Sequence, residues 1–274
     1  MDLWYILLNT IIYGGCALII AEIFSYGKFL HFAIWSYIMV AGYIFIFLNK
    51  FGLNTANLIM ILSLLLCFFG TNYLLLKVFP NERKREQAWL IITLWVSILL
   101  ENLWNYFYGW SAVSTKFWGV SNILLMILLI WLFWISYYFY KVSCIGKEFK
   151  AISEWWEIAS GLWINVNRNI QLLSIFLFIV ILLIAYLLIN TSSIRMQDGF
   201  YYMIKWIWIM MLVGLSKKEW LLLWALIYVL IEYFLFVKLW LPLMYKESLI
   251  LLIIIFCLLF KPEWLFNRKR FRKI

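Results

Sequence analysis

The feature that most constrains this chain is a succession of nine long apolar segments, at 3–24, 29–48, 55–78, 88–109, 118–141, 169–190, 200–215, 220–237 and 248–261. A helix of about 20 apolar residues crosses the hydrocarbon core of a bilayer. Hydrophobic residues make up 67% of the chain and charged residues only 13%, which is typical of membrane proteins. We therefore expect an all-α polytopic membrane protein with about eight or nine transmembrane helices, in a single domain over 1–274. The segment 200–215 is short, and we expect it to tilt or to re-enter the membrane.

Basic residues alternate between the loops that separate these segments. One set of loops holds 16 of them, at Lys28, Arg83, Lys84, Arg85, Lys141, Lys147, Lys150, Arg168, Lys217, Lys218, Lys261, Arg268, Lys269, Arg270, Arg272 and Lys273. The other set holds five, at Lys50, Lys116, Arg195, Lys238 and Lys246. Because cytoplasmic loops carry the excess of Lys and Arg, the N-terminus is predicted outside and the basic tail 261–274 in the cytoplasm. The net charge of +10 thus indicates a multi-pass inner-membrane protein in a lipid bilayer, and not a nucleic-acid partner.

The loop 142–168 is unusually long and polar for this chain, and we call it the coupling segment. Ile152, Trp155, Ala159, Leu162 and Val166 recur at helical spacing, so they are expected to form one apolar stripe. Glu154, Glu157, Gly161 and Asn165 form the opposite stripe, and Gly161 is expected to divide the segment into two short helices. Such a helix either lies in the headgroup region or docks on a partner protein, and the composition does not choose between these.

The coupling segment also carries a family resemblance. KAISEWWEIASGLWINVNR, at 150–168, resembles without a gap the cytoplasmic segment of permease subunits of branched-chain amino acid ABC importers. Further matches follow in order along the chain: ALIIAEIFSYG with FLHFAIWSYIMVAGY, then LIITLWVSILLEN, KWIWIMMLVGLS and the tail FKPEWLFNRKRFRK. The order of these matches makes the resemblance more specific than any one motif.

The resemblance implies a transport role that uses separate ATP-hydrolysing subunits. It places the ATPase-coupling residues at Glu154, Glu157, Ala159, Gly161, Ile164, Asn165 and Arg168. The implied partners are cytoplasmic ABC ATPase subunits, a second permease subunit that is related or identical, and an external solute-binding protein. The implied solutes are branched-chain amino acids or related small polar molecules.

Several polar residues lie inside the apolar segments, where a charge needs a partner or water. The candidates for a translocation pathway are Glu101, Asn102, Lys205, Gly214 and Glu232. One arrangement pairs Lys205 with Glu101 or with Glu232 around a water-filled path. The alternative is a salt bridge between helices that has no contact with solute.

No pattern for catalysis, metal binding or a cofactor is found in the sequence. The four cysteines are scattered and are expected to be reduced packing residues, and His31 is the only histidine and is expected to have a packing or turn role. The chain has no phosphate-binding glycine loop, so ATP hydrolysis would belong to another subunit. The sequence therefore predicts neither an enzyme nor a bound metal. The start of the chain lacks basic residues before its first apolar run, so we expect that run to be retained.

The chain departs from the family pattern at tryptophan. Of its 18 tryptophans, six stand where the family has glycine, namely Trp35, Trp95, Trp163, Trp220, Trp224 and Trp264. Bulky side chains at such positions are expected to push helices apart or to fill a pathway. Two explanations stay open: divergence to a different packing, or glycine codons (UGA in some bacterial lineages) read as tryptophan. The coding DNA decides between them, since UGG at these positions excludes the second.

Three other functions are alternatives to the amino-acid permease. One is a membrane scaffold of the same descent that transports nothing, and another is a permease of the same family for urea or short amides. A membrane enzyme is disfavoured, because no set of His, Cys or carboxylate residues converges within the apolar segments.

Overall fold

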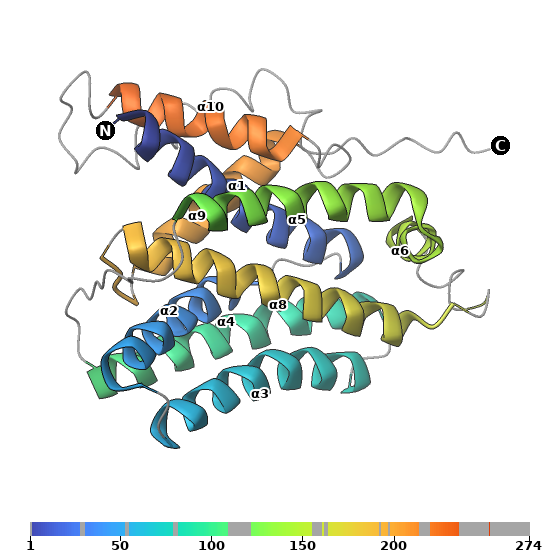
Figure 1. Cartoon of the computed structure of the whole chain (residues 1–274). Helices are drawn as coiled ribbons and strands as arrows, with labels where there is room; N and C mark the ends of the chain where they lie inside the picture. The colour runs from blue at the N-terminus through green and yellow to red at the C-terminus, as the bar shows by residue number, and fades with distance from the viewer. Residues whose placement is uncertain are drawn as a thin grey trace. The chain divides into compact units, whose positions relative to one another are not determined.

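The computed structural model describes residues 2–27, 31–52, 55–78, 82–108, 122–154, 161, 164–191, 193–196, 198–213, 220–235 and 252. Almost all of these residues are helical, and none of them forms a β-strand. The helices are α1 (Asp2–Gly27), α2 (Ile34–Phe51), α3 (Thr55–Val78), α4 (Glu82–Tyr108), α5 (Asn122–Val142), α6 (Cys144–Glu154), α8 (Val166–Thr191), α9 (Asp198–Val213) and α10 (Leu221–Tyr233) (Figure 1). The all-α prediction is confirmed for the described residues.

Four of these helices are long and apolar enough to cross a membrane. Their apolar parts are Leu3–Phe24, Ile34–Phe51, Ala88–Tyr106 and Gln171–Thr191. Two shorter apolar stretches lie at Met60–Gly70 in α3 and at Leu221–Tyr233 in α10. These helices fit a transmembrane protein; the expected total of eight or nine spans and the orientation stay predictions.

Some helix boundaries differ from those predicted from the apolar segments. Helix α2 begins at Ile34 and not near residue 29, after a turn at residues 32 and 33. Helix α4 begins at Glu82, before the apolar run from residue 88, because Glu, Arg, Lys and Gln are good helix formers. The described part of α9 has 16 residues and a length of about 24 Å, and the tilt or re-entry of 200–215 stays a prediction. Most of the predicted segment 248–261 lies outside the described residues.

The Cα packing divides the chain into two compact units. Unit 1 comprises Met1–Ala21 and Ile204–Ile274, and unit 2 comprises Glu22–Met203. In unit 2 the helix α2 is central and contacts α3, α4 and α8, and the three lie beside it in Figure 1. Its packing is close: a Cβ on Gly42 would lie 2.8 Å from Cδ1 of Ile194 and 3.3 Å from side-chain atoms of Ile189. The Tyr37 hydroxyl donates a hydrogen bond of 3.3 Å to the carbonyl of Cys67, which ties α2 to α3.

Helix α4 buries several polar residues and exposes several apolar ones, although Asn102 is exposed and Trp104 is buried. Thr93, Ser97 and Asn105 are buried, whereas Trp95 and Leu99 are 67% and 58% exposed. A water-soluble helix seldom exposes such large apolar side chains while it buries small polar ones. It suits a helix that presents apolar side chains to lipid and uses small polar residues against its neighbours.

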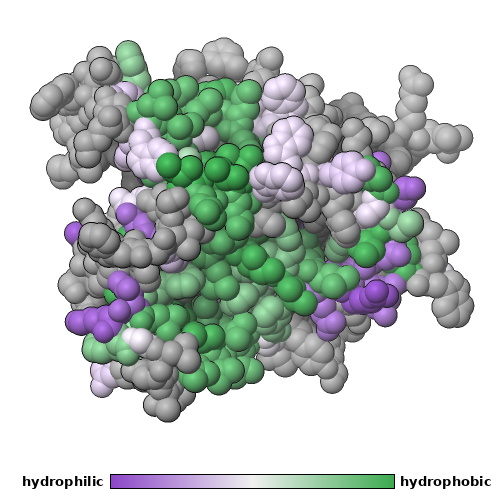
Figure 2. Space-filling model, viewed as in Figure 1, coloured by the Kyte–Doolittle hydropathy of each residue, from purple (hydrophilic) through white to green (hydrophobic). Residues whose placement is uncertain are grey.

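In unit 2 a polar end is formed where α6 and the start of α8 lie together. Helix α6 contacts both α5 and α8. Lys147, Lys150, Asn165 and Arg168 are exposed there. Figure 2 shows hydrophilic residues gathered over this end, beside a surface that is otherwise largely apolar where it is coloured.

Unit 1 brings the first part of α1 against α10. A Cβ on Gly14 would lie 2.8 Å from Cδ2 of Leu222 and 3.4 Å from Cβ of Ala225, so the glycine lets the two helices approach closely. The rings of Tyr13 and Tyr228 meet edge to face at 6.0 Å. Both contacts place α10 beside the part of α1 that carries Tyr13.

Candidate functional site

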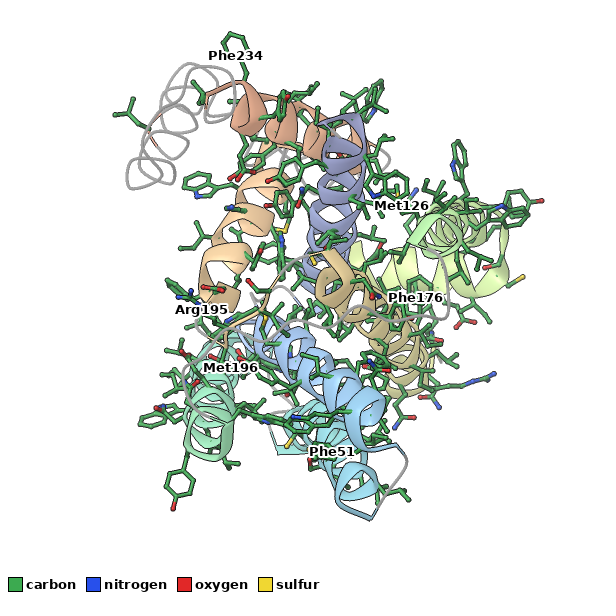
Figure 3. All side chains as sticks on the ribbon, turned by 60° about the vertical axis from the view of Figure 1, so that its left-hand side comes forward. Phe51, Met126, Phe176, Arg195, Met196 and Phe234 are labelled. Atoms are coloured by element: carbon green, nitrogen blue, oxygen red, sulfur yellow. The ribbon has the colours of Figure 1, made fainter. Side chains whose placement is uncertain are left out.

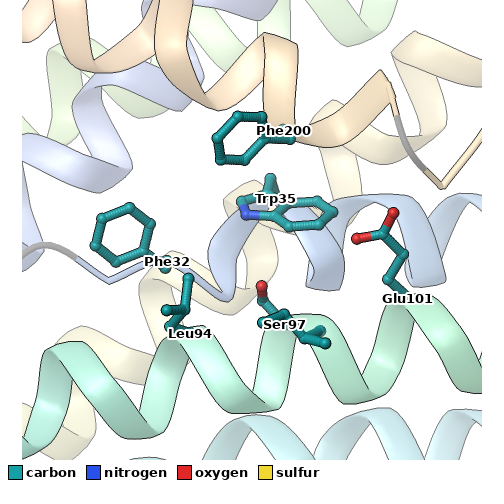
Figure 4. A pocket seen from close by; sticks show the side chains of 7 residues that line it. Phe32, Trp35, Leu94, Ser97, Glu101 and Phe200 are labelled. Carbon is teal, nitrogen blue, oxygen red and sulfur yellow. The ribbon is translucent and has the colours of Figure 1, made fainter.

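A pocket of about 480 Å³ lies in unit 2 among α4, the start of α2 and the start of α9. Its lining residues are Phe32, Trp35, Leu94, Ser97, Ile98, Glu101 and Phe200. Leu94, Ser97 and Glu101 recur at three- and four-residue spacing, so they lie on one face of α4. Figure 4 shows the side chains of Ser97 and Glu101 pointing from α4 toward the indole of Trp35.

Two hydrogen bonds fix the start of α2 against α4 beside this pocket. The backbone N–H of Phe32 donates to Oγ1 of Thr93 at 3.3 Å. The hydroxyl of Ser36 donates to the backbone carbonyl of Ser97 at 3.4 Å. Each bond joins a backbone group on one segment to a short side chain on the other, and together they fix Phe32 and Trp35 relative to α4.

The connection between α8 and α9 brings the third wall of the pocket into place. Arg195 and Met196, which Figure 3 labels in this connection, accept hydrogen bonds from the N–H groups of Asp198 and Gly199 at 3.1 and 3.3 Å. The first turn of α9 then presents Gly199 and Phe200 to α2. The rings of Trp35 and Phe200 meet edge to face at 6.4 Å. Any Cβ on Gly199 would overlap the indole of Trp35, so only glycine fits there.

The pocket is acidic and aromatic. Glu101 is the one charged residue among the lining residues, and three of the other six are aromatic. Ser97 is buried, and among the described residues its Oγ has no hydrogen-bond partner. Such a hydroxyl is uncommon, since most buried polar groups are satisfied by protein or by water.

The structure separates the predicted pathway residues into different places. Glu101 lines the pocket of unit 2, whereas Asn102 is exposed and donates a hydrogen bond of 2.8 Å to the Ile98 carbonyl on its own helix. Lys205 and Glu232 both belong to unit 1 and form a salt bridge of 3.2 Å. Of the two pairings considered for Lys205, the structure contains the one with Glu232. Gly214 lies outside the described residues.

The Lys205–Glu232 pair lies in an apolar surrounding with a tyrosine beside it. The side chains of Lys205 and Glu232 are 11% and 5% exposed. The lysine Nζ also donates to the Tyr13 hydroxyl at 3.5 Å and lies 5.5 Å from the centroid of that ring. The pair links α9 to α10 and, through Tyr13, to α1, so it is at least an interhelical link.

The coupling segment is described in part. Ser143 caps α6 by accepting a hydrogen bond of 2.9 Å from the N–H of Gly146. Asn165 caps α8 in the same way, with Oδ1 accepting from the N–H of Arg168 at 3.1 Å. The amide of Asn169 donates to the Glu148 carboxylate at 2.7 Å and ties α6 to the start of α8.

The predicted coupling residues fall at different points of this segment. Gly161 is helical and exposed, Ile164 is half-buried, and Asn165 and Arg168 are exposed at the start of α8. The side chain of Glu154, and Glu157 and Ala159 altogether, lie outside the described residues.

The stripe predicted from Ile152 to Val166 does not lie on one continuous helix, and its middle residues Trp155, Ala159 and Leu162 lie outside the described residues. Ile152 lies in α6, Val166 opens α8, and the non-helical residues Ile164 and Asn165 come between them. The physical reason is the cap at Asn165, which begins a new helix there. Gly161, the predicted point of division, is helical, and its neighbours on both sides lie outside the described residues.

The tryptophans at family glycine positions do not act alike. Trp35 is buried over Gly199, whereas Trp95 and Trp220 are 67% and 51% exposed. Trp95 and Trp220 therefore do not push packed helices of the described residues apart, and whether they fill a pathway stays a prediction. Trp224 is half-buried, and Trp163 and Trp264 lie outside the described residues.

His31 and the cysteines have simple surroundings. His31 is buried, with the rings of Tyr37 and Trp89 at 6.0 and 6.1 Å, as its predicted packing role requires. Burial lowers its pKa to about 4. Cys16 is buried and Cys67 is half-buried, but Cys144 is exposed, so the packing prediction is wrong for Cys144. Cys257 lies outside the described residues.

Sequence reasoning missed several residues that build these sites. They are Phe32, Ser97 and Phe200 in the pocket, and Ser143, Glu148 and Asn169 in the coupling segment. Ser97 stands one helical turn before Glu101, a spacing that could have indicated a shared face. Phe32 and Phe200 are unremarkable in a chain with 23 phenylalanines, and no sequence signal identifies them.

Comparison with known proteins gives no relative for this chain. No protein-family model matches it, and neither does any curated protein or any solved structure.

Proposed function

We propose that the chain is the membrane-spanning permease subunit of an ABC importer in the inner membrane. In this proposal an external binding protein delivers a small polar solute, and cytoplasmic ATPase subunits drive alternating access. A second permease subunit, related or identical, completes the pathway. The family resemblance of the coupling segment motivates the role, and one observation of the structure supports it.

That observation is the link between α6 and α8. A short polar helix that is capped at its start and held by the Glu148–Asn169 hydrogen bond moves with the first turn of a long apolar helix. A force applied to α6 from outside the membrane is then passed to α8, which packs on the central helix α2. Helix motion of this kind is what a docked ATPase needs in order to change access to a solute site.

The pocket of unit 2 is compatible with the transport role. Its volume of about 480 Å³ falls within the range of small-molecule sites. It lies between α2, the helix that contacts α8, and α4. A displacement of α8 would therefore reach a wall of the pocket through one helix contact.

Site-specific photo-crosslinking tests the docking. A photo-reactive residue in place of Lys147, which is exposed on α6, is expected to capture an ATPase subunit in native membranes. The matched control is the same residue in place of Leu62, exposed on α3, which is expected to capture none. Mass spectrometry then identifies the captured chain, which is expected to carry a nucleotide-binding motif in its sequence. Absence of an ATPase at position 147, or equal capture at position 62, would contradict the proposal.

A second candidate, the non-transporting scaffold, is favoured by one observation. The indole of Trp35 occupies space at the wall of the pocket and packs on Gly199, where smaller residues would leave a wider path. The scaffold predicts that no ATPase is captured and that no solute binds. Uptake by the complex reconstituted in liposomes separates the scaffold from a permease. A permease takes up amino acids, or urea and amides, whereas the scaffold takes up none of them.

A further inference from the structure

We propose that the pocket of unit 2 binds the ammonium group of a small organic amine, and that it selects against solutes that carry a carboxylate. The binding claim stands on the pocket itself, whereas the use of this site for transport rests on the proposed function. The inference departs from the amino-acid solutes that the family resemblance implies.

The first argument is the sign of the charge. Glu101 places a carboxylate at the pocket, and none of the seven lining residues carries a positive charge. Glu101 is half-buried, and a partly desolvated carboxylate with no basic residue among its pocket neighbours favours a cationic ligand. An amino acid would bring its own carboxylate into this pocket, where the lining offers it no basic partner.

The second argument is the aromatic lining. The side chains of Phe32, Trp35 and Phe200 border the pocket, and Trp35 is the central one of the labelled residues in Figure 4. The faces of aromatic rings attract ammonium ions, and tryptophan does so best. The edge-to-face contact of Trp35 with Phe200, and the close fit of the indole on Gly199, hold the Trp35 ring in one orientation.

The third argument is the hydroxyl of Ser97. It is buried and points toward Trp35, and its Oγ has no hydrogen-bond partner in the part of the chain that the structure describes. Ser97 and Glu101 lie one turn apart on the same face of α4. A ligand nitrogen that carries hydrogens could donate to both oxygens at once. The site therefore suits a primary amine better than a quaternary ammonium ion, which has no hydrogen to donate.

The size of the pocket limits the rest of the ligand. A volume of about 480 Å³ accepts a molecule of a few carbon atoms with room to spare. Leu94 and Ile98 supply apolar wall for a short alkyl chain. The ligand class is thus a short alkyl or aryl amine.

Three ligands of nearly equal shape test the proposal on the full-length protein in nanodiscs. They are 3-methylbutylamine, leucine, which adds a carboxylate to that amine, and 3-methylbutanol, which lacks the charge. Equilibrium binding is followed by quenching of tryptophan fluorescence and by calorimetry. The amine is expected to bind at least tenfold more tightly than either other ligand, in keeping with a charge-assisted hydrogen bond. Equal or tighter binding of leucine would overturn the proposal.

Two variants connect the affinity to the named residues. Glu101→Gln is expected to weaken amine binding about ten- to a hundredfold, and Ser97→Ala about three- to tenfold, with little change for the alcohol. The matched control Ser63→Ala removes an exposed hydroxyl from α3 and is expected to bind the amine like wild type. Wild-type affinity for the amine in both Glu101→Gln and Ser97→Ala would overturn the proposal. If a variant does not fold, the three-ligand comparison on the wild-type protein still tests whether the pocket prefers the amine.

The ammonium group could come from a free amine or from a lipid headgroup. Nanodiscs of phosphatidylglycerol alone offer no such headgroup, whereas nanodiscs with added phosphatidylethanolamine do. If added phosphatidylethanolamine weakens binding of the free amine, the lipid headgroup competes for the ammonium site and is its natural ligand. If binding of the free amine is unchanged, the natural ligand is a free amine. Failure of amine binding overturns this inference alone, and failure of the crosslink at position 147 contradicts the proposed function alone.

Discussion

At the scale of single residues, the contact between Trp35 and Gly199 explains how a very bulky side chain fits in this bundle. The indole lies against a backbone that has no Cβ, and Met39, one turn further along α2, has its Cγ 3.1 Å from where a Cβ would be. Trp35 thus follows the common membrane-protein pattern in which a small residue allows close packing of the helix opposite. The resemblance predicted glycine at position 35, and the small residue lies instead on the partner helix.

We predict that Gly199→Ala destabilises the protein by about 1–3 kcal/mol, because the new Cβ overlaps the Trp35 ring. Thermal unfolding in detergent measures the effect. Gly70→Ala is the matched control: its Cβ meets nothing within 4 Å in α3, so alanine there is expected to be neutral or stabilising. Adding Trp35→Leu to Gly199→Ala is expected to restore part of the loss. An equal loss in the single and double variants would show that the overlap is not the cause.

A second prediction concerns His31 and pH. Burial lowers its pKa to about 4, from a value near 6.5 in the unfolded chain. The folded state therefore binds fewer protons than the unfolded state between these values, and its stability falls as the pH is lowered through that window. The melting temperature of wild type is expected to drop more between pH 6.5 and pH 4 than that of His31→Gln. Parallel pH profiles of the two proteins would contradict this account.

At the scale of helices, the arrangement depends on a few polar links between apolar surfaces. The links are Phe32 to Thr93, Ser36 to Ser97, Tyr37 to Cys67, Glu148 to Asn169 and Lys205 to Glu232. Lipid is as apolar as leucine, so burial of apolar surface alone does not choose the helix partners. Polar links and small residues therefore specify which helices meet.

The Lys205–Glu232 pair gives the third prediction. Lys205→Met removes the lysine from a carboxylate that is 5% exposed, and is expected to destabilise the protein by about 3–5 kcal/mol. The double variant Lys205→Met with Glu232→Gln removes the buried charge as well and is expected to regain much of the stability. Thermal unfolding of the two variants is compared with that of Lys147→Met, in which an exposed lysine of α6 is replaced. If the double variant is no more stable than the single one, the unpaired Glu232 carboxylate is not the cause of the destabilisation.

The positions of the long helices follow from the sequence, whereas their exact ends do not. Apolar runs predicted the positions of the long helices well, because a run of 20 apolar residues has few alternatives to a membrane-spanning helix. Their ends were less certain: α2 starts later than its apolar run, and α4 starts earlier. Hydropathy does not register caps and turns, such as the cap at Asn165 that begins α8 within the coupling segment.

At the scale of the whole molecule, the pairing of distant residues was the least predictable feature. Lys205 had two possible carboxylate partners in the sequence, and only the packing of α9 and α10 selects Glu232. The pocket needs residues from α2, α4 and α9 that are far apart in the chain, so no local pattern identifies it. Glu101 stands out in the sequence because a carboxylate in an apolar run needs a partner or water, and it lines the pocket; its role in a translocation pathway stays a prediction.

Labelling of Cys144 tests most directly the claim that a motor docks on the cytoplasmic side. Cys144 is exposed at the start of α6, so a variant that keeps it as the sole cysteine carries a natural reporter. A membrane-impermeant maleimide is expected to leave this protein unlabelled in intact cells and to label it in inside-out vesicles. Labelling in intact cells would place α6 outside, beyond the reach of any cytoplasmic ATPase, and would contradict the account.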